Sequence, residues 1–181
     1  MPARCAGFSR RNRTSGRLWA CSPPWFTPPA AGRSRTWAAG PGTSLPTLRE
    51  LGDVARRDHP GLRFEVGSMT DLSLPDASVA GLLAFWSLIH VPDDGVPAVF
   101  GHFRRALRDG GPLLLGFHAG DGSRMKTLGY GGHPMKVCIH YRQPVQVAAW
   151  LRDAGFTVEA QMLLDPGESM PGALLFARRR P

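Results

Sequence analysis

Acidic residues are absent from the first 49 positions of this 181-residue chain. The same stretch contains eight arginines, whereas the whole chain has 22 basic and 14 acidic residues. Removing those eight leaves 14 basic residues against 14 acids, so the formal charge of +8 lies in the N-terminal stretch and the remainder is neutral. Residues 1–47 are also rich in proline and lack a sustained hydrophobic period, which predicts an irregular basic leader.

Cysteine is scarce, with only Cys5, Cys21 and Cys138 in the chain. This odd number, without metal-ligand spacing, argues against a disulfide framework and a zinc site and favours a reducing, cytoplasmic location. Long apolar runs are missing too, because residues 79–85 and 113–117 have the length of single strands rather than of a membrane-spanning helix. We therefore expect one soluble core without a metal site.

From residue 48 onward, the hydrophobic pattern is that of an α/β domain. The predicted order is strand, strand, helix, strand, helix, strand, strand, at residues 62–66, 79–85, 93–107, 112–118, 144–154, 156–164 and 172–178. Pro144 begins the second helix, and Gly155 ends it. Residues 119–139 form a polar, glycine-rich excursion without a structural pattern of its own, for which a lid, a binding loop and disorder all stay open.

Three motifs lie in this part of the chain, at residues 63–79, 80–90 and 107–111, and their order and spacing match those of a known protein family. Together they resemble the second half of class I S-adenosylmethionine-dependent methyltransferases, of the methyltransferase type 11 kind. The resemblance implies a Rossmann-like doubly wound sheet that is incomplete in its N-terminal half and closed by a C-terminal antiparallel hairpin. It also implies that residues 48–181 are a partial methyltransferase domain.

The resemblance further implies S-adenosylmethionine as cofactor and a small-molecule methyl acceptor. In such sheets, ligands bind at the carboxyl ends of strands. Ser68 and Met69 follow the first strand, where the family holds adenine, although an ordinary turn is an equal alternative. Ala84, Phe85 and Trp86 end the central strand beside the family's cofactor cleft. We expect Phe85 to pack in the core and Trp86 to face the cleft, where its ring would cover the sulfonium.

His90 follows the central strand and is the candidate catalytic residue. An imidazole titrates near neutral pH, so it can take a proton from an oxygen or nitrogen nucleophile. The alternative is a structural role, which is more common for a lone histidine in an apolar run. Methyl transfer needs in-line positioning and exclusion of water more than it needs a base.

The first half of the family pattern is damaged in this sequence. In the family, the domain begins with the motif Asp-Leu-Gly-Cys-Gly-x-Gly, whose glycines bind the cofactor. In this sequence, only Gly40 and Gly42 correspond to those glycines. Shifting the reading frame over residues 36–43 permits Asp-Leu-Gly-Cys-Gly-Pro-Gly-His. We therefore interpret the segment before about Leu48 as an out-of-frame translation. The family's next strand, which ends in a ribose-binding carboxylate, is missing after Gly52.

The sequence thus favours methyl transfer from S-adenosylmethionine to an unidentified small molecule. The alternative is a non-catalytic interaction or nucleic-acid-binding protein with a basic N-terminal arm on a degenerate α/β domain. The leader composition also suits a transit peptide, but its proline pairs interrupt any amphipathic helix. We expect neither a membrane nor a nucleic acid as the main partner, and the sequence leaves the oligomeric state open.

Overall fold

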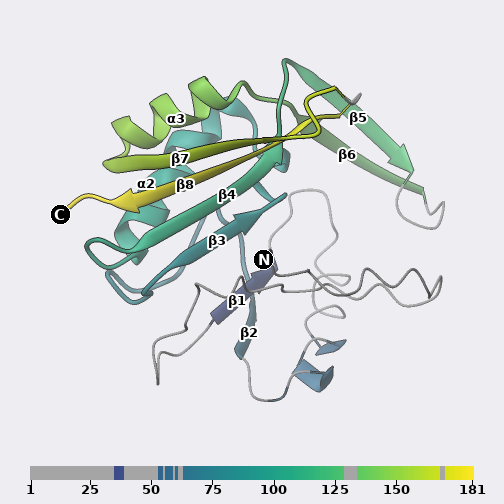
Figure 1. Ribbon diagram of the computed structural model, residues 1–181. Coiled ribbons are helices and arrows are strands. Elements are labelled where there is room, and N and C mark those ends of the chain that lie inside the picture. Colours follow the sequence, from purple (N-terminus) through teal and green to yellow (C-terminus); the bar gives the residue numbers. More distant parts are fainter. Residues whose placement is uncertain are drawn as a thin grey trace, which may run out of the picture. The chain divides into compact units, whose positions relative to one another are not determined.

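The computed structural model describes residues 35–38, 53–54, 56–58, 60, 63–128, 134–167 and 170–181 (Figure 1). The strands are β1 (Arg35–Ala38), β2 (Arg63–Val66), β3 (Leu82–Phe85), β4 (Pro112–His118), β5 (Ser123–Leu128), β6 (Pro134–His140), β7 (Phe156–Leu164) and β8 (Gly172–Arg179). The helices are the 3-10 turns η1 (Leu88–His90) and η2 (Asp93–Gly95) and the α-helices α2 (Val96–Ala106) and α3 (Pro144–Asp153). None of the helices in these ranges is long and apolar enough to cross a membrane.

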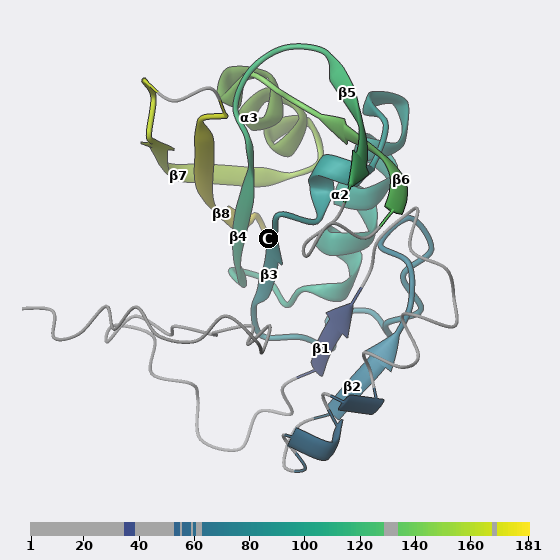
Figure 2. The same ribbon diagram turned by 90° about the vertical axis from the view of Figure 1, so that its right-hand side faces the viewer.

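The main sheet has four strands in the order β3-β4-β8-β7. Strands β3 and β4 are parallel and run side by side in Figure 2, whereas β8 is antiparallel to both β4 and β7. The hairpin of β7 and β8 therefore closes the sheet, as the sequence predicted. The observed bounds of β4 and β7 equal the predicted ones, because uninterrupted apolar or alternating runs between glycine and proline punctuation define them.

One face of this sheet is buried against α2 and α3. Leu113, Leu115 and Phe117 alternate along β4 and are at most 1% exposed. They pack in one cluster with residues of the apolar faces of α2 and α3, such as Phe100 and Leu151. Burying a side chain of this size stabilises the fold by about 1.5–3 kcal/mol, so this layer supplies much of the stability. Figure 1 shows both helices on the same side of the sheet.

The turn between α2 and β4 requires its two glycines. Gly110 has a φ of +70°, which a residue with a Cβ adopts only with strain. A Cβ on Gly111 would lie 2.8 Å from the carbonyl oxygen of Arg108 and 3.1 Å from that of Ala80. The helix already ends at Ala106, where Leu107 becomes extended, so the predicted role of the glycine pair in ending the helix is wrong, and its predicted role in returning the chain into the sheet is confirmed.

Residues 119–139 were expected to have no structure of their own, and this expectation is wrong. Strands β5 and β6 form an antiparallel hairpin within this segment. Val137 and Ile139 on β6 are buried, and the residues opposite them on β5 are Lys126 and Arg124. Because the long stems of basic side chains can cover apolar neighbours, β5 pairs without the apolar alternation by which strands are recognised in a sequence.

Strands β1 and β2 are parallel and paired along all four residues. We predicted an irregular leader for residues 1–47, so β1 is an addition to that prediction. Backbone hydrogen bonds make the ladder, and they do not require the sustained hydrophobic period that residues 1–47 lack. Since β1 and β2 are direct neighbours, no strand lies between them. The remainder of residues 1–47 lies outside the described residues.

Candidate functional site

Two aromatic side chains meet at the carboxyl ends of β3 and β4. Because these strands are parallel, Trp86 directly after β3 and His118 at the end of β4 emerge at the same edge of the sheet. Their ring centroids are 5.2 Å apart and their planes differ by 15°. Phe85 stacks on Trp86 at 5.1 Å, and Tyr141 lies 5.7 Å from His118. We call Phe85, Trp86, His118 and Tyr141 the ring row.

Two glycines give the ring row its space. A Cβ on Gly116 of β4 would lie 2.8 Å from the ring of Phe85. A Cβ on Gly172 of β8, which pairs with His118, would lie 2.9 Å from the indole of Trp86. Trp86 itself has a φ of +50°, a left-handed conformation that costs a non-glycine residue about 1–2 kcal/mol. Such strain persists only where its surroundings hold it, here a 2.8 Å hydrogen bond from its N–H to the carbonyl of Gly116.

The imidazole of His118 is held in an environment that favours its neutral form. Burial lowers its pKa below the ordinary value of 6.5, and Lys126, Arg124 and His90 lower it further by charge repulsion. Among the described residues, nothing hydrogen-bonds to its buried Nδ1 atom. His118 is therefore neutral at physiological pH and retains an unused polar atom beside two aromatic rings.

His90 is the last residue of η1 and follows Trp86 of the ring row by four positions in the sequence. Its Nδ1 atom is 3.2 Å from the carbonyl oxygen of Cys138 on β6. Because a carbonyl only accepts hydrogen bonds, this contact places a proton on Nδ1. It orients the ring and leaves Nε2 as the nitrogen that can exchange a proton.

Arg142, just after β6, fixes the segment that carries His90. It is 1% exposed, and among the described residues it is the one charged side chain in the buried class. Its guanidinium donates to the carbonyl of Leu88 at 2.9 Å, to the carbonyl of Val91 and to the carboxylate of Asp93 at 2.8 Å. Each of the three guanidinium nitrogens makes one of these bonds, which offsets the cost of burial and ties η1 and η2 to the end of the β5–β6 hairpin.

The loop after β2 contains the residues predicted to hold adenine. Ser68 is exposed, and its Oγ is 2.7 Å from the hydroxyl of Thr70 and accepts the N–H of Thr70 at 3.2 Å. Met69 is 6% exposed and belongs to the core cluster. The loop is therefore anchored by one buried side chain and turns a hydroxyl toward solvent.

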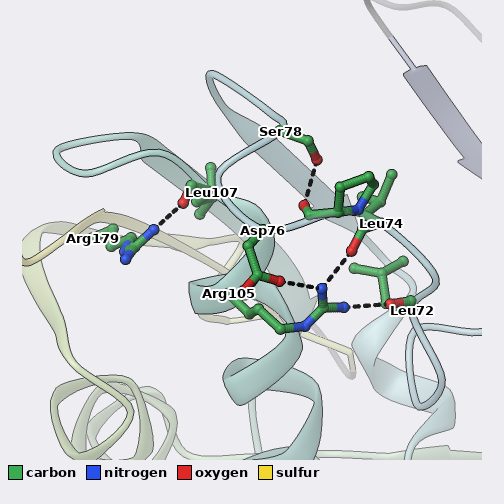
Figure 3. A network of polar contacts seen from close by, with 8 residues as sticks. Leu72, Leu74, Asp76, Ser78, Arg105, Leu107 and Arg179 are labelled. Atoms are coloured by element: carbon green, nitrogen blue, oxygen red, sulfur yellow. Dashed lines mark hydrogen bonds and ion pairs between the residues drawn. The ribbon is translucent and has the colours of Figure 1, made fainter.

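The chain that follows this loop is clamped to α2 by Arg105 (Figure 3). The Arg105 guanidinium donates to the carbonyl of Leu72 at 2.6 Å, to the carbonyl of Leu74 and to the carboxylate of Asp76 at 2.8 Å. Ser78 closes the next turn through a 2.6 Å bond to the carbonyl of Pro75. These contacts fix the segment that directly follows the Ser68 loop. None of them was evident from the sequence.

The structure changes the expected roles of the aromatic residues. Phe85 was expected in the core, but it is 52% exposed, because alternate residues of β3 face away from the helices. Trp86 is partly buried and stacks on Phe85 and His118. Ala84 is 4% exposed in the core. Gly40 and Gly42 lie outside the described residues.

Sequence reasoning missed His118, Tyr141 and Arg142. His118 could have been found, since it is the last residue of a correctly predicted strand and ligands bind at strand ends. Tyr141 and Arg142 follow a strand that was not predicted, so their position gave no signal. Only the fold brings them to His118 and His90.

No protein-family model matches the sequence, and no curated protein matches it. Solved structures do. A methyltransferase from Methanosarcina mazei, described as S-adenosylmethionine-dependent, is similar with a TM-score of 0.64 at 17% identity over 81% of this chain and 82% of that one. The fold is class I methyltransferase-like.

Two further structures show the range of proteins that share the fold. The 1,6-didemethyltoxoflavin-N1-methyltransferase of Burkholderia thailandensis, solved with its substrate and S-adenosylhomocysteine, has a TM-score of 0.56 at 20% identity over 73% of this chain and 57% of its own. The cyclase SpnF has a TM-score of 0.57 at 17% identity over 82% and 76%. A methyltransferase-like fold therefore does not by itself fix the reaction.

Proposed function

We propose that this protein binds S-adenosylmethionine and transfers its methyl group to a small-molecule acceptor. The observation that carries the proposal is the edge where β3 and β4 end, with the oriented ring of His90 and the ring row, in a methyltransferase-like fold. Two similar structures were solved with S-adenosylhomocysteine and with S-adenosylmethionine bound, which supports the same cofactor here. The free thiol of Cys138 agrees with a reducing, cytoplasmic location.

The described residues fit the adenine and methyl ends of this cofactor. Ser68 keeps a lone pair for the adenine amino group when its hydroxyl donates to that of Thr70, and the burial of Met69 holds its backbone N–H in place. Ala84 is small enough to let the cofactor approach, and the exposed ring of Phe85 is better placed than Trp86 to cover a sulfonium. In this proposal Gly40 and Gly42 lie along the methionine part, and Trp86 supports the cleft wall.

The ribose end of the cofactor fits less well. In the family a strand ending in a carboxylate lies next to the glycine-loop strand, but here β1 and β2 are direct neighbours. A missing charged hydrogen bond costs about 1.5–3 kcal/mol, so we expect weakened cofactor binding. When bound, S-adenosylmethionine supplies an electrophilic methyl carbon, and its carbon–sulfur bond breaks as the acceptor lone pair bonds to that carbon. His90 Nε2 receives the proton that the acceptor loses.

Calorimetric titration of the full chain with S-adenosylmethionine tests the proposal. Ser68→Ala should weaken binding about fivefold to tenfold through the lost hydrogen bond, and Ser73→Ala on the neighbouring exposed turn is the matched control. His90→Asn should leave binding intact and slow turnover of an accepted substrate. Absence of any heat at millimolar cofactor would overturn the proposal for this chain.

We also propose that the damage in the first half arose in the coding sequence. Residues 1–47 have the acid-free, arginine-rich composition expected when GC-rich codons are translated out of frame. DNA sequencing across codons 30–55 checks this directly. An alternative frame interrupted by stop codons would refute it, whereas an open frame encoding Asp-Leu-Gly-Cys-Gly would support it.

A further inference from the structure

The β5–β6 hairpin is basic and contains no acid. From Ser123 to Arg142 the sequence has no Asp or Glu, while β5 carries Arg124 and Lys126 and β6 carries Lys136. The nearest preceding acid, Asp121, is bonded to Gln143 at 2.7 Å. A surface element with charge of one sign favours a ligand of the opposite sign.

Two of these cations share the inner face of the hairpin. In the antiparallel register, Arg124 lies opposite Ile139 and Lys126 lies opposite Val137. Directly paired residues project on the same face of a two-stranded sheet, and both of these β6 residues are buried. Arg124 and Lys126 therefore lie on the face that packs inward, and Lys136 lies on the opposite face.

The inner face is held at the carboxyl edge of β3 and β4. Arg142 bonds the end of the hairpin to η1 and η2, and Cys138 accepts a hydrogen bond from His90. Tyr141, directly after β6, contacts the ring of His118. The charges of Lys126 and Arg124 reach this edge, since both lower the pKa of His118. The positive charges of Arg124 and Lys126 therefore act at the ring row.

Arg124 has hydrogen-bonding capacity to spare. The acceptor that its guanidinium contacts is the thioether sulfur of Met170, at 3.6 Å from Nη2. A thioether is a weak acceptor, whereas a guanidinium has five donors in a planar fork that matches a carboxylate. The side chain is exposed, so an incoming carboxylate can replace the sulfur without breaking a buried contact.

We propose that the hairpin recognises a flat aromatic acid as the methyl acceptor, with Arg124 and Lys126 binding its carboxylate and the ring row contacting its ring. This inference rests on the proposed methyl transfer, because it names the acceptor class of the same site. It assigns the selection of the acceptor to the hairpin segment, whose role the sequence left open. Aromatic stacking selects the flat ring, and the two cations select the acid.

Binding of salicylate and its neutral isostere salicylamide, measured by calorimetry on the full chain without cofactor, tests the proposal. We expect salicylate to bind at least about tenfold more tightly than salicylamide, as for a carboxylate held by charged donors. The double variant Arg124→Gln/Lys126→Gln should abolish this preference. Lys136→Gln removes a charge from the outer face of the same hairpin and should change salicylate affinity less than about twofold.

Each contrary outcome has a definite meaning. Equal affinity for the two probes, no binding of either, or an equal effect of the inner-face and outer-face variants would overturn the proposal. Glutamine keeps the first two methylenes of each stem beside Val137 and Ile139, and an unchanged melting temperature shows that the variants are folded. If salicylate binds as expected but S-adenosylmethionine does not, the hairpin site stands and the methyl-transfer proposal falls.

Discussion

The indole of Trp86 stacks on the imidazole of His118, with ring centroids 5.2 Å apart and planes 15° from parallel. The two residues are 32 positions apart in the sequence and meet because β3 and β4 are parallel neighbours. Trp86 accepts a strained backbone for this contact, which makes the stack a sensitive point of the structure.

Gly172→Ala should disturb this stack. The new Cβ would lie 2.9 Å from the Trp86 ring and 3.3 Å from Leu164, and neither a stacked indole nor a strand neighbour can move freely. We expect a loss of about 1–3 kcal/mol in the free energy of unfolding, measured with urea. Gly167→Ala, where an added Cβ meets nothing within 4 Å, is the control and should change stability by about 0.5 kcal/mol or less. Equal effects of the two substitutions would contradict the packing argument.

Arg142→Met should destabilise the protein more than any substitution of an exposed arginine. It leaves the carbonyl of Val91 without its side-chain donor, at about 1–3 kcal/mol, and removes one of the two donors to the buried carbonyl of Leu88, which keeps the N–H of Val91 at 3.1 Å. Denaturant unfolding measures the loss, and Arg152→Met on the exposed side of α3 is the matched control. Amide hydrogen exchange should speed up in η1 before it does so in the main sheet. Uniform exchange across both would show that Arg142 does not act locally.

Stability should fall when the pH drops below 6.5. Burial lowers the folded-state pKa of His118 and of His140 below that ordinary value, so the unfolded chain binds more protons than the folded one in this window. The free energy of unfolding therefore rises with pH toward 6.5 and levels off above it, as far as these two groups decide. Urea midpoints on either side of that value check the sign. His118→Asn should reduce the slope, and an unchanged slope would exclude His118 as a source.

Lys126→Gln should raise the pKa of His118. After burial, Lys126 is the largest cause of the lowered pKa, and removing its charge relieves repulsion of the imidazolium. A pH titration of the imidazole carbon–proton signals by nuclear magnetic resonance measures the change. Lys136→Gln should leave this pKa unaltered, since Lys136 is not among the groups that act on His118. Identical titration curves for wild type and Lys126→Gln would place Lys126 away from the ring row.

The main sheet illustrates how much of a fold a sequence pattern can predict. Strand β4 and helix α3 were predicted nearly to the residue, because apolar periodicity and bordering Gly and Pro are local properties. The β5–β6 hairpin was missed because Arg124 and Lys126 of β5, and not apolar residues, lie opposite the buried Ile139 and Val137 of β6. Hydrophobic alternation does not reveal a strand whose inner face carries arginine and lysine.

The candidate site was predictable only in outline. The sequence placed His90 and Trp86 near strand ends, and those positions are correct. It could not assign the tautomer of His90, which depends on Cys138, or the exposure of Phe85, which depends on the face of β3 that the helices leave open. Both are contacts between segments that are distant in the chain.

By itself, the sequence determined the strands of the main sheet and the helices α2 and α3, the confinement of the charge excess to the first 49 residues, and the family that the motifs resemble. These follow from local periodicity, turn residues and composition. Tertiary structure alone decided that His118 neighbours Trp86, that Arg142 is buried under η1, and that Arg124 and Lys126 face the same edge of the sheet. Such neighbours are set by parallel strand pairing and by hairpin register, and neither is encoded within the few residues that a sequence pattern spans.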